Sequence, residues 1–276
     1  MHSFQPLDRR TFLADLGRGA FALAVVTIAG CGPSGSATAS ASRAAATPSS
    51  GSGSPSPGAS ASDTPGGSAS DGPPPGSGSG EGVTWERVNL GFVSAYILAR
   101  AGEAAIVDTG VEGSGDEIES SLSAAGLDWS AVAHLILTHH HGDHVGSAAD
   151  VLERAPEATG YAGAEDIPAI TVPRSLTAVA DGDDVFGLRI VTTPGHTAGS
   201  ISVLDPVGGV VVVGDAIRTE GGAPALPGAQ FTVDMDQAKQ SIVKLGGMTF
   251  ETLLVGHGDP IEGGASALVA ELGAAG

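Results

Sequence analysis

The chain has 276 residues and a formal net charge of −19 at pH 7, because 31 acidic residues outweigh 12 basic ones. This balance argues against a nucleic-acid partner, since binding to phosphates requires clustered lysine and arginine. The single cysteine excludes an intramolecular disulfide and any metal site built from several thiolates.

Residues 1–31 have the pattern of an export signal. Arg9 and Arg10 precede an apolar stretch over residues 20–29 that is too short to span a bilayer as a helix. The paired arginines resemble a twin-arginine signal peptide, and the residues that end at Cys31 resemble a bacterial lipobox. That position favours lipidation over the alternative role of a small buried hydrophobe. We therefore predict an exported lipoprotein, anchored to the membrane through Cys31 on the outer face of the cytoplasmic membrane and released in part.

Residues 32–82 consist almost wholly of Gly, Ser, Pro, Ala and Thr. Because they lack aromatic and large aliphatic side chains, they cannot bury enough surface to offset the entropy of ordering, and we predict a disordered linker. The remaining residues, 83–276, are of the right length for one domain. They hold eight basic and 26 acidic residues, since four basic and five acidic ones come earlier, and we interpret their charge of −18 as a solubility feature.

Short runs rich in valine and isoleucine predict seven strands, over residues 94–99, 104–107, 133–138, 188–192, 200–204, 209–213 and 252–255. The spacing of apolar residues predicts four helices. Ser114 and Glu117 form a capping box at the start of the first helix, and the second helix covers residues 145–152. Asp234 and Gln237 cap the third helix, and the fourth helix lies near the end of the chain. Many strands with inserted helices favour an α/β sandwich of two sheets flanked by helices over a doubly wound sheet.

The densest group of potential metal ligands is the run His-His-His-Gly-Asp-His over residues 139–144, which follows a predicted strand. His139 and His141 project to the same side of an extended segment, whereas His140 points away. A polar group at the end of an apolar strand is costly unless it is paired or bound to a metal. Three further residues occupy such positions and, with the run, indicate a metal-dependent enzyme: His196, Asp215 and His257.

Together these residues resemble the full signature of the metallo-β-lactamase superfamily, which reads here His139-Xaa-His141-Xaa-Asp143-His144, Pro194-Gly195-His196-Thr197, Gly214-Asp215 and Gly256-His257. The resemblance covers essentially all of residues 83–276 and implies a four-layer αββα sandwich. It also implies a first metal bound by His139, His141 and His196, a second bound by Asp143, His144 and His257, and Asp215 as a bridge between them. Asp108 resembles the family's early strand-end aspartate, which hydrogen-bonds to a ligand instead of binding the metal.

Imidazole and carboxylate ligands suit zinc, so two Zn²⁺ ions are the expected cofactors, with manganese or iron as alternatives. Two such ions hold a bridging hydroxide at neutral pH, polarise a carbonyl group and stabilise the oxyanion that develops. Asp143 would orient the hydroxide and shuttle a proton. The resemblance thus implies a zinc-dependent hydrolase that cleaves an ester, thioester or lactone bond in a small-molecule substrate.

Asp215 separates this chain from the β-lactamase subclass that shares the run 139–144, because that subclass has a small polar residue at the bridging position. The pattern is closer to glyoxalase II, thioesterases and acyl-homoserine lactonases. Glyoxalase II holds glutathione with a C-terminal helical domain, and 19 residues follow His257 here, so glutathione thioesters are not the expected substrate. The alternatives are a mononuclear Fe²⁺ dioxygenase that acts on persulfides, a β-lactamase-type amide hydrolase and a non-catalytic metal-binding lipoprotein.

Two histidines are expected to have structural roles, namely His134 within a predicted strand and His140 within the run. The Gly- and Pro-rich residues 219–231 are expected to border the substrate pocket. Arg218 is the only basic side chain near a matched motif, and it either meets a substrate carboxylate or is an exposed loop arginine.

Overall fold

The computed structural model describes residues 81–275. The predicted signal peptide, the predicted lipidation site Cys31 and most of the predicted linker lie outside the described residues. Val83, near the start of the described residues, is buried, and its amide donates a hydrogen bond of 2.6 Å to Asp205 Oδ2. Within residues 81–275, no helix combines the length and the apolar character that a membrane span requires.

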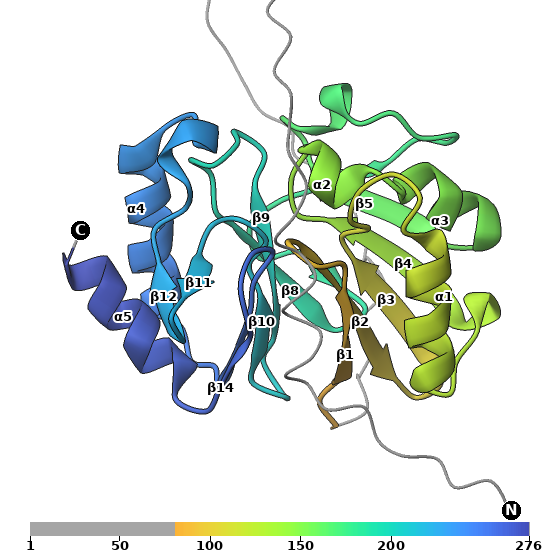
Figure 1. Ribbon diagram of the computed structural model, residues 1–276, viewed down its shortest axis with the longest axis horizontal. Helices are drawn as coiled ribbons and strands as arrows, with labels where there is room; N and C mark the ends of the chain where they lie inside the picture. Colours follow the sequence, from red (N-terminus) through yellow and green to blue (C-terminus); the bar gives the residue numbers. More distant parts are fainter. Residues whose placement is uncertain (1–80, 276) are drawn as a thin grey trace, which may run out of the picture. The chain divides into compact units, whose positions relative to one another are not determined.

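The first half of the domain builds a six-stranded sheet with the order β1-β2-β3-β4-β5-β6 (Figure 1). The first three strands are antiparallel neighbours, and β3 to β6 pair in parallel. The strands are β1 (Thr84–Asn89), β2 (Ser94–Arg100), β3 (Glu103–Val107), β4 (Val132–Leu137), β5 (Thr159–Gly163) and β6 (Thr177–Val179).

The second half builds another six-stranded sheet with the order β14-β13-β10-β9-β8-β7. Only β10 and β13 pair in parallel within it, and a separate small hairpin is formed by β11 and β12. The strands are β7 (Asp184–Val185), β8 (Leu188–Thr192), β9 (Ile201–Asp205), β10 (Val210–Val212), β11 (Arg218–Glu220), β12 (Ala223–Ala225), β13 (Thr252–Leu254) and β14 (Ile261–Glu262).

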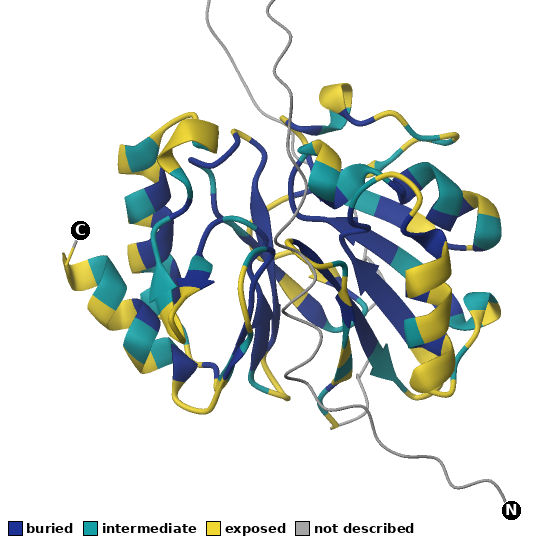
Figure 2. Cartoon of the chain, in the orientation of Figure 1, coloured by how far each residue is buried: buried dark blue, intermediate teal, exposed yellow. Residues whose placement is uncertain are grey.

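Helices cover the outer face of each sheet (Figure 1). The first sheet carries α1 and α3 with the short α2, and the second carries α4 and α5. Their outward faces are exposed while the strands between them are buried (Figure 2). The helices are α1 (Gly115–Ala124), α2 (Gly142–Val145), α3 (Ala148–Arg154), α4 (Met235–Gly246) and α5 (Ala265–Ala275), with single 3₁₀ turns η1 (Trp129–Ala131), η2 (Ile167–Ala169) and η3 (Ala229–Phe231).

Alternation of side chains along the strands explains why the layers stack in this way. In β2, Ile97 joins a core beneath α1 and α3, whereas its neighbours Tyr96 and Leu98 face the other sheet. In β10, Val212 faces the first sheet and Val211 joins a third core beneath α4 and α5. Three cores separate four layers, which confirms the predicted αββα sandwich.

All seven predicted strands are present, with ends that shift by at most one residue. The predicted capping box at α1 is wrong, because the Ser114 hydroxyl donates to the Val111 carbonyl and makes no cap hydrogen bond. Residues 145–152 do not form one helix, since α2 ends at Val145 and α3 begins at Ala148. The N-cap of α4 is confirmed, because Asp234 Oδ1 accepts a hydrogen bond of 2.9 Å from the Gln237 amide.

Candidate metal centre

The candidate ligands come from the carboxyl ends of strands in both sheets. Strands β3 and β4 are parallel, as are β10 and β13, so their carboxyl ends lie at one edge of each sheet. The amide of Ile201 donates to the Thr138 carbonyl with a length of 2.9 Å, which joins these edges across the sandwich. The residues that follow the strand ends are therefore brought together in space, although they are spread over more than a hundred positions of the sequence.

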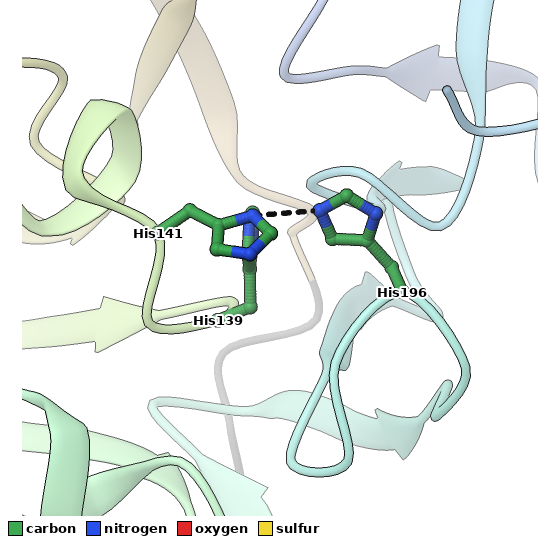
Figure 3. Close-up of side chains that lie close together, drawn as sticks. All are labelled: His139, His141 and His196. Atoms are coloured by element: carbon green, nitrogen blue, oxygen red, sulfur yellow. Dashed lines mark hydrogen bonds between the residues drawn. The ribbon is translucent and has the colours of Figure 1, made fainter. Parts of the chain in front are cut away.

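The first cluster consists of His139, His141 and His196, whose rings turn toward one another (Figure 3). His141 Nδ1 lies 3.1 Å from His139 Nε2 and 2.9 Å from His196 Nε2. A neutral ring nitrogen carries either one N–H or one lone pair, so Nδ1 of His141 can satisfy only one of these two neighbours. A cation at the centre would satisfy all three nitrogens at once.

The second cluster consists of Asp143, His144 and His257. His257 Nε2 lies 3.3 Å from Asp143 Oδ2, and the His144 ring is completely buried. Asp215 stands between the clusters. Its Oδ2 lies 3.4 Å from His196 Nε2 in the first cluster and 3.2 Å from His257 Nε2 in the second, and its Oδ1 lies 3.2 Å from His144 Nε2.

The outer nitrogen of four of these rings has a partner that fixes the tautomer. His257 Nδ1 donates to the Phe92 carbonyl at 2.7 Å, and a carbonyl can only accept. Nδ1 of His196 faces the Thr232 hydroxyl, which itself donates to the Gly228 carbonyl. In the neutral form of both rings the proton is therefore on Nδ1, which leaves Nε2, the nitrogen that faces the site, free to bind a metal. The same argument holds for His139, whose Nδ1 faces a Thr138 hydroxyl that itself donates to Asp108. It also holds for His144, whose Nδ1 faces the Asp108 carboxylate.

Asp108 links the first sheet to the second cluster. It has a left-handed backbone conformation, with φ of 61°, directly after β3. Its Oδ2 accepts hydrogen bonds of 2.7 Å from His144 Nδ1 and from the Thr138 hydroxyl, and its Oδ1 accepts one from the Thr138 amide. The carboxylate thus holds His144 and the residue before His139 at the same time, and it directs no oxygen at the cluster centres.

Charges differ between the clusters. Burial lowers the pKa of His196 to about 4, and burial beside His144 lowers the pKa of His139. Hydrogen bonds to Asp143 and Asp215 raise the pKa of His257 to about 10. Burial opposes the charge of His144, but Asp108 and Asp215 outweigh it and raise the pKa of that ring to about 10. Near neutral pH the first cluster thus offers neutral imidazoles, whereas in the second cluster a metal must displace protons from His144 and His257.

The donor set fits two divalent cations. Two buried atoms that face each other, His144 Nε2 and Asp215 Oδ1, have no hydrogen-bond partner of good geometry. Such atoms are expensive to leave unpaired in a protein interior. Imidazole nitrogen and carboxylate oxygen are ligands that zinc and similar divalent cations accept, so these groups could hold metal ions.

Two glycines are required for this arrangement because backbone approaches the ligands closely. A methyl group on Gly256 would lie 2.5 Å from both Asp215 Oδ1 and His144 Cε1. One on Gly214, where φ is 52°, would lie 2.4 Å from Thr138 Oγ1. Glycine directly before Asp215 and directly before His257 therefore lets the two sheet edges meet.

The two remaining histidines of the described residues lie outside the clusters. His140 is turned away, with Nδ1 3.1 Å from Asp166 Oδ2. His134 packs between Tyr161 and Phe186 in the core between the sheets, with ring centroids 5.8 and 5.2 Å away. Neither ring contributes an atom to either cluster.

Asp166 is a buried residue of the site that the sequence did not reveal. Its carboxylate accepts hydrogen bonds from the His140 amide at 3.0 Å, the Thr197 hydroxyl at 2.6 Å and the Gly199 amide at 2.8 Å. It therefore joins the loop that carries His139 and His141 to the loop that carries His196. Thr232, which orients His196, was missed as well, and neither residue belongs to a recognisable motif.

A pocket of about 1090 Å³ opens over the clusters, and His141, Asp143, His196, Asp215 and His257 form its floor. Its walls come from Phe92 in the β1–β2 turn, from the segment 226–231 and from α4. The prediction that residues 219–231 border a pocket is thus confirmed for its second half.

Arg218 also lines the pocket, but its guanidinium already has partners. Nε donates to the Leu226 carbonyl at 3.0 Å, and Nη2 lies 2.9 Å from Glu220 Oε2. These contacts hold the β11–β12 hairpin against the pocket wall. Of the two predicted roles, these contacts favour the exposed arginine over the substrate contact, although Arg218 begins strand β11 instead of lying in a loop and is paired with Glu220.

Comparison with known proteins places the chain in a well-populated group. A family model described as the metallo-beta-lactamase superfamily matches residues 88–257. A probable metallo-hydrolase of Bacillus subtilis, YflN, is 30% identical over 57% of this chain and 76% of its own length. A hydroxyacylglutathione hydrolase of Alkalilimnicola ehrlichii is 33% identical over 43% of each chain, so this chain spans less than half of that relative.

Solved structures share the fold. A metallo-beta-lactamase family protein from Thermus thermophilus, TTHA1429, superposes with a TM-score of 0.57 and 23% sequence identity, over 70% of this chain and 79% of its own. This likeness concerns the architecture of the two sheets and their helices. The matched family model, by contrast, spans all seven residues of the clusters, from His139 to His257.

Proposed function

Because this chain belongs to the metallo-beta-lactamase superfamily, we propose that it is a metal-dependent hydrolase that holds two zinc ions and cleaves an ester, thioester or lactone bond. The observation that carries the proposal is the place of Asp215. Its two carboxylate oxygens lie 3.2 to 3.4 Å from nitrogens of both clusters. A carboxylate between two groups of ligands is the arrangement that a pair of divalent cations needs.

In this proposal the first ion is held by His139, His141 and His196, and the second by Asp143, His144 and His257, with Asp215 shared. When bound, the two cations would supply a hydroxide nucleophile near neutral pH and stabilise negative charge on a carbonyl oxygen. The protein's own groups orient the reaction. Asp143 lines the pocket, and its pKa is lowered by the hydrogen bond from His257, so the ionised carboxylate can accept a proton from the attacking water.

The leaving group needs a proton, and Asp143 is the pocket carboxylate that would return it after the C–O or C–S bond breaks. Asp108 has a different task, because it holds the His144 ring in the tautomer that presents Nε2 to the centre. Removal of Asp108 would therefore weaken metal binding directly, and it would lower the rate of bond cleavage only as a consequence of the lost metal.

The number and identity of the bound metal ions separate this reaction from the iron dioxygenase. A mononuclear site would use one group of ligands, whereas the proposed hydrolase uses two. In this chain Asp143 joins His144 and His257 as a second complete group of three. Substrate turnover distinguishes the proposed hydrolase from the β-lactamase-type amide hydrolase and from the non-catalytic metal-binding lipoprotein.

The test is metal analysis of the purified protein, followed by a panel of chromogenic esters, thioesters, lactones and β-lactams. We expect about two equivalents of zinc and turnover of at least one of the first three classes. Less than about one equivalent of metal with His139 and His141 intact would refute the proposal. Turnover of β-lactams alone would favour the amide hydrolase, iron with oxygen uptake would favour the dioxygenase, and metal without any turnover would favour the binding protein.

We also propose the organisation of the chain that its N-terminal residues suggest: a twin-arginine signal over residues 1–31, a linker over 32–82 and a catalytic domain over 83–276. In this proposal Cys31 is lipidated and anchors the enzyme outside the cytoplasmic membrane. The double variant Arg9→Lys, Arg10→Lys should leave active enzyme inside the cell. Active lipoprotein at the surface of cells that make this variant would contradict twin-arginine export.

A further inference from the structure

One wall of the pocket combines a basic residue with apolar side chains. Lys239 and Met235 lie four residues apart on α4, so they occupy the same face of that helix, and both line the pocket. Phe92 and Phe231 also line the pocket, and their exposed fractions of 63% and 64% are large for phenylalanine. The pocket therefore offers a substrate a positive charge and an apolar surface together.

Lys239 differs from the other basic residues near the site because it forms no ion pair within residues 81–275. Arg218 in the same pocket is paired with Glu220, Arg87 is paired with Asp259, and Lys244 on the same helix is paired with Asp181. The ammonium group of Lys239 is thus available for an anion that enters the pocket.

The position of Lys239 is fixed relative to the metal ligands. The segment that leads into α4 is bound to the His196 loop, because the Val233 amide donates to the His196 carbonyl and the Asp234 amide donates to the Gly195 carbonyl. Further along the helix, the Ser241 hydroxyl donates to the Pro194 carbonyl at 2.7 Å. Lys239 lies between these attachments, so the stem of its side chain starts from a rigid base.

The negative charge of the rest of the domain helps to explain what the positive charge of Lys239 does. With eight basic and 26 acidic residues in positions 83–276, the domain repels anions at long range, so steering does not explain a lysine at this place. A local ion pair in a partly desolvated pocket acts instead on substrate choice. Apolar residues beside it would contact the chain that joins the anion to the reacting carbonyl.

We propose that the substrate is a carboxylic ester, thioester or lactone whose acyl part carries a second, anionic group, with a carboxylate as the simplest case. Lys239 pairs with that anionic group, while Phe92, Phe231 and Met235 contact the apolar spacer. This inference rests on the proposed hydrolysis, in which water adds across the acyl bond, the C–O or C–S bond breaks, and the leaving alcohol or thiol takes a proton.

The experiment uses the zinc-loaded full chain and two esters with the same acyl length, 4-nitrophenyl hexanoate and mono-(4-nitrophenyl) adipate, which differ only in a terminal carboxylate. Lys239→Met keeps the apolar stem and removes the charge. We expect KM for the adipate ester to rise about five- to tenfold, as for a partly desolvated charged hydrogen bond. KM for the hexanoate ester should stay within about twofold.

Two further variants serve as controls. Lys239→Arg should restore most of the preference for the adipate ester, because it restores the charge. Lys244→Met removes a lysine from the same helix outside the pocket, and it should leave the ratio of the two KM values unchanged. An equal change of both KM values in Lys239→Met, or no change in either, would overturn the inference.

A binding measurement separates this inference from the proposed function. Calorimetry of the products, adipate and hexanoate, compares the same two groups without turnover. Wild type should bind adipate about five- to tenfold more tightly than Lys239→Met does, and the two proteins should bind hexanoate equally. If neither ester is hydrolysed but adipate binding shows this difference, the proposed hydrolysis of these esters fails and the anion site stands. Equal adipate binding by both proteins overturns the anion site.

Discussion

The two ligand clusters use similar residue types but differ in charge. His139, His141 and His196 are surrounded by other imidazoles and by buried surface, which lowers their pKa values. His144 and His257 face carboxylates, which raise their pKa values to about 10. The difference shows that carboxylates decide which imidazoles carry protons that a metal must displace. Asp215 belongs to both clusters, and it is the group on which the comparison depends.

The largest effect is expected for Asp215→Asn. Loss of this negative charge removes the shared ligand, so the protein should retain at most about one zinc ion per chain. We expect kcat/KM for a chromogenic ester to fall by about a thousandfold, which corresponds to about 4 kcal/mol of transition-state stabilisation. Asp181→Asn, at an exposed carboxylate paired with Lys244, is the matched control and should retain both ions. Two retained ions in Asp215→Asn would contradict a bridging role.

Gly256→Ala tests the close approach of the second cluster to the strand end. The added methyl group would lie 2.5 Å from Asp215 Oδ1 and His144 Cε1, so at least one ligand must move. We expect about a hundredfold loss of kcat/KM, as is typical when reacting groups are displaced by about 1 Å. Gly142→Ala meets no atom within 4 Å and should keep nearly full metal content. Normal metal content and activity in Gly256→Ala would show that the site tolerates this shift.

Asp166→Asn should affect the first cluster more than the second. The carboxylate accepts three hydrogen bonds from the loops that carry His139, His141 and His196, and in asparagine an NH₂ donor would replace one of the two accepting oxygens and face N–H or O–H donors. We expect the affinity for the more tightly held zinc ion to fall about 10- to 100-fold, measured by competition with a chelator. Asp128→Asn, at an exposed 3₁₀-helix cap, is the control. Equal losses for both ions would mean that Asp166 stabilises the fold as a whole.

Proton release during zinc binding should distinguish the clusters by pH. At pH 7, the first cluster is already neutral, so its ion should release few protons. His144 and His257, with pKa values of about 10, are protonated at this pH, and their ion should release about two. Affinity for that ion should therefore rise with pH up to about 10, by about tenfold per pH unit for each proton. Calorimetry in buffers of different ionisation enthalpy measures both steps. Equal proton release in the two steps would contradict the difference.

Much of the fold and of the site could be predicted because both depend on local patterns. Buried strands leave runs of valine and isoleucine, and candidate ligands follow those runs directly, as Asp215 follows β10 and His257 follows β13. The order of the strands in each sheet could not be read from such runs. The β11–β12 hairpin had a usable signal, because Gly221 and Gly222 both have positive φ and suit a two-residue turn, and it was missed.

The supporting residues were hidden for a physical reason. Asp166 acts on residues 26 to 33 positions away, and its own neighbours in the sequence form only a short 3₁₀ turn. Ser114 had the right spacing for a capping box, but its hydroxyl bonds to the Val111 carbonyl while its amide donates to Ser147. Tertiary contacts override local preference in such places.

A zinc titration of the metal-free protein, combined with analysis of bound metal after removal of excess zinc, tests the central claim most directly. The account predicts two ions per chain, bound in two steps with different proton release, and it predicts that Asp215→Asn retains at most about one. A single step with one ion per chain, in a protein whose seven candidate ligands are intact, would contradict it.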